Sequence, residues 1–319
     1  MTLGVPEEGT GVESPTQLPI EDLTRPVDDR QLQPGPASKS PFRLALRRFR
    51  HHKLAMIGLV ILVILAILAI LAPWISPFDP NAVDLAQFRK PPSAEHWLGT
   101  DDAGRDVLSR LLYGARVSLT VGVVAALSAG FIGLTLGLLS GFLGGWVDGV
   151  IMRLTEVVLS FPSLVVIILL VAVIGPSVTS IIVVIAVFEW PTGCRIVRQI
   201  TRVTKETGYV LAARSVGAPN IRIILRHTVG SVVSPLTVVV TLLSAQAILL
   251  EAALSFLGLG VNPPQASWGG MLQSAQSLTV LSDYPWLWIP PGAAIAITVL
   301  SINFVGDGLR DAFDPRQEM

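Results

Sequence analysis

Two acidic residues stand inside long apolar segments of this chain, where a charge is costly. Glu189 lies in the sequence Phe-Glu-Trp-Pro, and Glu251 follows Ile-Leu-Leu. A charged side chain at the centre of a bilayer costs about 2.5–3.5 kcal/mol on insertion scales, so such groups face a polar cavity or a partner. Because Gln246 and Ser255 lie five and four residues from Glu251, we expect these three to form a polar stripe along a pore. A helix-packing hydrogen bond of the Glu251 carboxyl group is the alternative. For Glu189, two residues before Pro191, a local structural role is favoured, since proline leaves a backbone carbonyl free.

A basic segment further along the chain carries apolar residues at helical spacing. The positions are Tyr209, Ala212, Ala213 and Val216, then Ile221, Ile224, Leu225 and Thr228. Gly217 between them supplies the left-handed residue that ends a helix, and Pro219 is suited to the first turn of another. A helix–glycine–helix unit with an exposed apolar face fits a groove on a partner protein. A helix pair lying on anionic lipid is the alternative.

Other kinds of chemistry lack the residues they need. The single cysteine, Cys194, excludes an internal disulfide, and none of the four lysines follows a glycine as a nucleotide-binding phosphate loop requires. The histidines do not cluster at metal-ligand spacing; they are His51, His52, His96 and His227. We therefore expect no catalytic residue, no cofactor and no metal in this chain.

The elements that carry these residues are membrane helices. Of the 319 residues 51% are hydrophobic and 14% charged, against about a quarter charged in soluble domains, which excludes a soluble globular protein. Equal numbers of basic and acidic residues, 23 each, give no net charge that would point to nucleic acid. Charge-free stretches predict an all-α polytopic membrane protein whose six spans cover approximately 54–73, 117–142, 157–175, 177–199, 231–258 and 286–306. Residues 1–40, acidic and proline-rich, predict a disordered tail.

The distribution of basic residues predicts the orientation of the spans. Lys39–Lys53 and Arg195–Arg226 are basic, so both termini and the segment between spans four and five are expected in the cytoplasm. Loops 74–115 and 259–285 are then external. Basic residues in the first of these loops depart from the rule; they are Arg89, Lys90, Arg105 and Arg110.

Two features at span two have structural interpretations. After Asp101 and Asp102, a helix from Val107 is expected to lie on the outer membrane surface as an elbow, either purely structural or in contact with a binding protein. Small residues then recur along the span, at Gly122, Ala126, Gly130, Gly133, Gly137 and Gly141. They predict close helix packing, within the chain rather than across a pair of subunits.

The segment YVLAARSVGAPNIRIILRHTV (209–229) resembles the cytoplasmic coupling loop of ABC-importer permeases, whose pattern is Glu-Ala-Ala, three residues, then Gly. Ala212, Ala213 and Gly217 match the motif. Leu211 stands where that family usually has Glu, and Val229 and Gly230 stand at its usual Leu-Pro. By this resemblance the residues that contact the ATPase are Tyr209, Leu211, Ala212, Ala213, Val216, Gly217 and Ile221.

Further strings are similar to the C-type permease of the oligopeptide, dipeptide and nickel importers. They are LGTDDAGRDVLSRLLYGARVSL (98–119), EAALSFLGLGVNPPQASWGGML (251–272) and GDGLRDAFDP (306–315). The resemblance implies a first helix and external loop in 41–100 and a transport core in 101–319, with a coupling loop at 201–229. It implies docking of a binding protein at the loop containing Trp268.

The resemblance also implies the partners: a second homologous permease, two cytoplasmic ATPases that bind ATP and magnesium, an external substrate-binding protein, and the lipid of a bacterial inner membrane. The expected cargo is a short peptide, with nickel or another small solute as the alternative. A secondary transporter and a scaffold without a pathway are the hypotheses from other classes.

Overall fold

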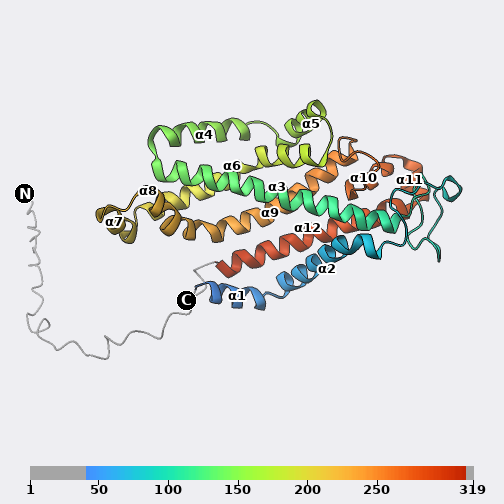
Figure 1. Cartoon of the computed structure of the whole chain (residues 1–319), viewed down its shortest axis with the longest axis horizontal. Helices are drawn as coiled ribbons and strands as arrows, with labels where there is room; N and C mark the ends of the chain where they lie inside the picture. The colour runs from blue at the N-terminus through green and yellow to red at the C-terminus, as the bar shows by residue number, and fades with distance from the viewer. Residues whose placement is uncertain (1–40, 314–319) are drawn as a thin grey trace, which may run out of the picture. The chain divides into compact units, whose positions relative to one another are not determined.

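The computed structural model describes residues 41–313, which form helices and loops without a β-strand in that range (Figure 1). The five long helices are α2 (Lys53–Ile75), α3 (Val107–Leu143), α6 (Val178–Lys205), α9 (Val229–Phe256) and α12 (Pro285–Phe313). The shorter ones are α1 (Pro41–His51), η2 (Leu85–Gln87), α4 (Gly145–Leu159), α5 (Ser163–Ile174), α7 (Gly208–Ser215), α8 (Asn220–Ile223), η3 (Ile224–Thr228), α10 (Trp268–Leu272), η4 (Gln273–Gln276) and α11 (Leu278–Asp283). The tail predicted for residues 1–40 lies outside the described part.

The five long helices are apolar enough to cross a bilayer, and the shortest of them has 23 residues. At 1.5 Å per residue each exceeds the roughly 30 Å of a hydrocarbon core. The bent pair α4 and α5 supplies a sixth apolar segment. The prediction of an all-α polytopic membrane protein is therefore confirmed.

The third span differs from its prediction. A single helix over 157–175 is wrong, because α4 ends at Leu159, α5 begins at Ser163, and the two axes meet at 86°. Pro162 lacks an amide hydrogen and disfavours helical geometry at Phe161, and it forms the N-terminal cap of α5. The predicted turn at Gly175 is confirmed, with φ of 103° between α5 and α6.

Two other helices also begin at residues different from those predicted from the sequence. No separate surface elbow precedes span two, because α3 runs without interruption from Val107 to Leu143. Its N-terminal cap is Asp106, whose carboxylate accepts a hydrogen bond from the Ser109 amide at 2.7 Å. The second short helix of the basic segment is likewise the beginning of span five, since α8, the π-helical turn η3 and α9 follow one another directly.

Glycines on α3 allow the bundle to pack closely. A Cβ atom added at Gly137 would lie 2.7 Å from the Cys194 carbonyl oxygen of α6, and one at Gly141 would lie 2.8 Å from the Arg198 carbonyl oxygen. On another side of α3, a Cβ atom at Gly122 would lie 2.4 Å from Ile248 of α9. The small residues therefore pack within the chain, as predicted.

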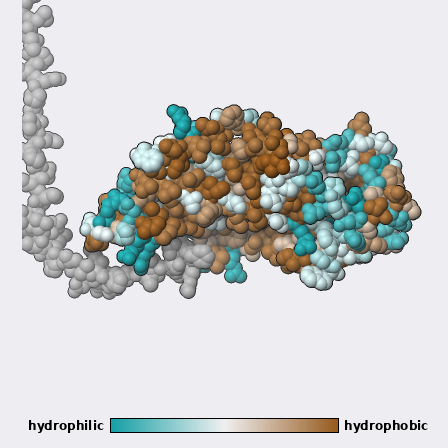
Figure 2. Space-filling model, turned by 45° about the horizontal axis from the view of Figure 1, so that its top comes forward, coloured by the Kyte–Doolittle hydropathy of each residue, from teal (hydrophilic) through white to brown (hydrophobic). Residues whose placement is uncertain are grey.

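The bundle has two polar ends. Figure 1 shows α7 and α8 at one end of the long helices, and α10, α11 and the loop before α3 at the other. Residues 206–228 are called the α7–α8 end below, and residues 76–106 with 257–284 the loop end. On the face drawn in Figure 2, apolar surface covers the middle of the bundle and hydrophilic residues gather toward both ends. A helix bundle in lipid has this distribution.

Candidate functional site

The α7–α8 end is a short helical unit attached to the bundle by a few side chains. Val210 is buried, and half-buried Ala213 packs against the same apolar cluster, which includes Phe142 and Val197. Gly217 separates α7 from α8 with φ of 79°, the left-handed geometry that the sequence predicts at this position. No other atom lies within 4 Å of the place its Cβ would occupy, so backbone conformation alone favours glycine here.

The outer side of this end presents large apolar side chains to solvent. Val216 is 85% exposed, and Tyr209, Leu211, Ile221 and Leu225 are also exposed. This concentration of exposed apolar side chains at a polar end of the molecule makes it a candidate interaction surface, because burying them against a partner is favourable.

Which residues of the two short helices are buried and which are exposed differs from the prediction. Ala212 is exposed beside Tyr209, whereas Ala213 turns inward. Ile224 and Thr228 are buried while Ile221 and Leu225 point outward, so these four do not form one face. At about 100° per residue, Ile224 and Thr228 lie on one side of this stripe and Ile221 and Leu225 on the other, so the boundary between bundle and solvent divides it.

Basic residues border the apolar surface. Arg214, Arg222 and Arg226 are exposed, and the Arg214 guanidinium lies 5.7 Å from the centre of the Phe142 ring. The ring of Tyr209 lies 6.0 Å from that of His227. An apolar surface with a basic rim suits a protein groove with an acidic edge, and it also suits anionic lipid.

A partly buried ion pair near this end was not anticipated from the sequence. Asp148, in the first turn of α4, receives two hydrogen bonds from Arg198 of α6, with Nη2 to Oδ2 at 2.6 Å, and one from Ser140 of α3. The Arg202 guanidinium lies 3.5 Å away. The available signal was an acid three residues after the glycine pair Gly144 and Gly145. The pair ties α3, α4 and α6 together at the point where α4 leaves the bundle.

Glu251 is fully buried near the loop end of α9. Its carboxylate accepts hydrogen bonds from Ser118 of α3 at 2.8 Å and from Ser255 at 2.7 Å. The Ser118 hydroxyl in turn accepts from the Trp268 backbone amide at 3.3 Å, and Ser267 lies 3.4 Å from Ser255. Both carboxylate oxygens are thus used in joining α3, α9 and the start of α10, which is the packing role that the sequence offered as the alternative.

The remaining predicted positions are spread over the helices. Gln246 is exposed on α9, apart from Glu251 and Ser255, so the three do not form one stripe. A pathway role for them stays a prediction, with Gln246 as its exposed member. One carboxylate oxygen of Glu189, Oε1, is buried without a hydrogen-bond partner among residues 41–313. The local satisfaction favoured for Glu189 is therefore incomplete.

Trp268 anchors the loop end from within. Its side chain is 1% exposed, and its indole nitrogen donates a hydrogen bond to the Leu111 carbonyl at 3.0 Å. The predicted docking residue therefore positions the loop and does not offer its own side chain as a surface.

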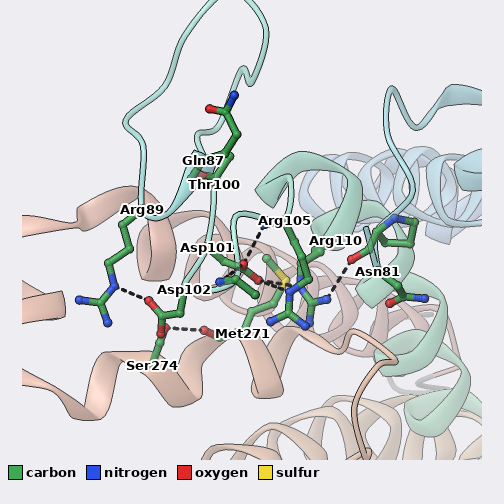
Figure 3. A network of polar contacts seen from close by, with 12 residues as sticks. Asn81, Gln87, Arg89, Thr100, Asp101, Asp102, Arg105, Arg110, Met271 and Ser274 are labelled. Carbon is green, nitrogen blue, oxygen red and sulfur yellow. Dashed lines mark hydrogen bonds and ion pairs between the residues drawn. The ribbon is translucent and has the colours of Figure 1, made fainter. Parts of the chain in front are cut away.

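Ion pairs neutralise arginines of the loop end and of the start of α3 (Figure 3). Asp101 lies 2.8 Å from Arg105 and 3.3 Å from Arg110, and Arg89 pairs with Asp102. The hydrogen bond to Asp102 raises the pKa of Arg89 above its usual value. This pairing gives a physical reason why arginines are tolerated in a loop that the distribution of basic residues assigns to the outside. A cavity of about 270 Å³ lies between this network and Met271 and Ser274.

The long apolar helices, with the α7–α8 end on one side and the loop end on the other, have the architecture of a membrane-spanning transport subunit. Residues 133–319 match the family of binding-protein-dependent transport system inner membrane components. Residues 40–92 match the N-terminal transmembrane domain of oligopeptide transport permease C. The chain belongs to this family of transport permeases, which form the membrane part of ABC transporters and are not their catalytic subunits.

Curated relatives share most of the chain. It is 42% identical over 279 residues to the oligopeptide transport system permease protein OppC of Bacillus subtilis, covering 88% of this chain and 91% of that protein. It is 40% identical, over the same length and shares, to the dipeptide transport system permease protein DppC of Alkalihalophilus pseudofirmus.

Proposed function

We propose that this chain forms half of the translocation pathway of an ATP-driven importer for short peptides, and that its α7–α8 end receives the motion of a cytoplasmic ATPase. The observation that carries the proposal is the apolar surface of Tyr209, Leu211, Val216, Ile221 and Leu225 at a polar end of a membrane bundle. A secondary transporter has no use for such a surface.

The proposed partners follow from the two ends. Two ATPase subunits bind ATP and magnesium. One docks at the α7–α8 end of this chain, and the other docks on a second permease of the same family, which completes the pathway. A substrate-binding protein delivers the cargo at the loop end. The oligopeptide and dipeptide systems named for the relatives favour peptide cargo over nickel.

The proposed location is a bacterial plasma membrane, with both termini and the α7–α8 end in the cytoplasm. Single cysteines at Asn220 and Gln265, each in a Cys194→Ser background, test it, because both positions are exposed at opposite ends. An impermeant thiol reagent added to intact cells should label position 265 and spare position 220. The reverse pattern would invert the topology.

Gly217→Val tests the coupling role. Valine at φ of 79° is strained by about 1 kcal/mol or more, and no neighbouring atom adds a clash. In proteoliposomes we expect the variant to assemble in the membrane but to hydrolyse ATP with reduced peptide uptake per ATP. Gly149→Val is the matched control, since it also meets no neighbour but has no left-handed backbone.

Substitutions on the two alanines separate docking from folding. Ala212 is exposed and Ala213 is packed, so Ala212→Trp should weaken ATPase association without displacing α7, whereas Ala213→Trp should displace it. Leu211→Glu should be tolerated, and Leu211→Ala should weaken docking slightly. If both Gly217→Val and Ala212→Trp keep the original peptide uptake per ATP, the ATPase must act on another surface. That result would favour a lipid-facing α7.

A further inference from the structure

Arg116 differs from the paired arginines of the loop end. It is exposed on α3, directly before the charge-free stretch that begins at Val117. Within residues 41–313 no hydrogen bond or ion pair engages its guanidinium, whereas Arg105 and Arg110 both pair with Asp101. A cation at the edge of an apolar membrane segment extends toward the interface and is stabilised there by an anion.

Two cavities of opposite character meet at this residue. The first is an apolar groove of about 400 Å³ between α2 and α3, lined by Ala66, Ala69 and Ile70 on one side and Leu119, Val123 and Val124 on the other. It runs from Arg116 along α3 to Val124, eight residues or about 12 Å of helix. Figure 1 shows the first part of α3 beside α2, the two helices that line the groove.

The second cavity, of about 200 Å³, lies on the polar side of Arg116. Its hydrogen-bonding side chains besides Arg116 are Asn81, Tyr113 and Gln265, and its lining contains no acidic residue. A cation would therefore find no counter-charge in this cavity, while hydroxyl groups and phosphate oxygens would find donors.

We propose that this pair of cavities binds an anionic phospholipid in the membrane leaflet at the loop end. Arg116 pairs with the lipid phosphate, one acyl chain occupies the groove between α2 and α3, and the hydroxyl groups of a glycerol headgroup contact Asn81, Tyr113 and Gln265. An ethanolamine headgroup fits less well, because its ammonium group would lie beside Arg116 without an acid to pair with. A lipid fits the groove better than a neutral apolar helix does, because its phosphate pairs with Arg116.

The test is native mass spectrometry of the full-length chain, delipidated in detergent and titrated with palmitoyl-oleoyl phosphatidylglycerol or the matching phosphatidylethanolamine. We expect one retained phosphatidylglycerol per chain, bound at least tenfold more tightly than phosphatidylethanolamine. Arg116→Gln should reduce the phosphatidylglycerol affinity to that of phosphatidylethanolamine, and Arg116→Lys should stay within about threefold of the original. Ala66→Trp, which fills the groove, should weaken both lipids.

Arg153→Gln is the control, because Arg153 is an exposed arginine of α4 that pairs with Glu156 and lies outside both cavities. Equal retention of the two lipids by the original chain would overturn the proposal. So would equal losses of phosphatidylglycerol affinity in Arg116→Gln and Arg153→Gln. In the assembled transporter, efficient disulfide crosslinking of Ala66→Cys, under a mild oxidant, to a cysteine introduced in an apolar helix of the second permease would also overturn it, since protein would then fill the groove.

Discussion

The buried carboxylate of Glu251 allows a stability prediction that can be worked from its contacts. Leucine at this position is similar in size but accepts no hydrogen bond, so the hydroxyl groups of Ser118 and Ser255 both lose their acceptor. An unsatisfied buried donor costs about 1–3 kcal/mol, and each serine recovers part of this by turning to a carbonyl of its own helix. We therefore expect Glu251→Leu to lower the free energy of unfolding by about 3 kcal/mol.

Glutamine should cost much less. Its carbonyl oxygen accepts from one serine, and its amide donates to the other, whose hydroxyl can reverse. We expect Glu251→Gln to cost about 1 kcal/mol. At about 2–4 °C per kcal/mol, the melting temperature should fall by roughly 6–12 °C for the leucine variant and by less than about 4 °C for glutamine.

The single cysteine provides the assay. Cys194 is fully buried, so a dye that fluoresces on reacting with thiols reports unfolding in detergent without any engineered site. The variant Glu251→Leu with Ser255→Ala removes one donor together with the acceptor and keeps Ser118, which accepts from the Trp268 amide, so it should melt above Glu251→Leu alone. Equal melting temperatures for the leucine and glutamine variants would refute this account of the network.

Other predictions concern packing within the bundle. Gly137→Leu should lower the free energy of unfolding by about 1–3 kcal/mol, because α3 and α6 must separate where a Cβ would meet the Cys194 carbonyl at 2.7 Å. Tryptophan fluorescence during heating measures this loss, and the control Gly149→Leu should be nearly neutral. Asp148→Asn should cost about 2 kcal/mol, since it weakens a partly buried ion pair with Arg198. Adding Arg198→Gln should then cost less than it does in the original chain, and additive losses in the double-mutant cycle would contradict this pairing.

Features set by local chemistry could be predicted from the sequence. Long charge-free stretches located the five long helices, and Gly175 and Gly217 marked turns whose left-handed backbone the structure contains. The break at Pro162 has an equally local cause, yet the apolar composition on both sides of it indicates one continuous span. Apolar character alone does not show that a helix bends.

Features set by contacts between distant segments could not be predicted. Glu251 meets Ser118 across 133 positions of the chain, and Asp148 meets Arg198 across 50. Spacing along one helix suggested Gln246 as a companion of Glu251, but five residues place it on a different side of α9. The inward turn of Ala213 likewise depends on packing against Phe142 and Val197, which no local pattern indicates.

Photocrosslinking from Val216 tests the proposed coupling surface most directly. This side chain is exposed at the α7–α8 end, and Trp97 is comparably exposed at the loop end. A benzophenone amino acid placed at each position in the assembled transporter reports what lies within a few ångströms. We expect position 216 to crosslink to the ATPase subunit and position 97 not to. Crosslinks from position 216 to lipid alone, or to the ATPase only from position 97, would contradict the account.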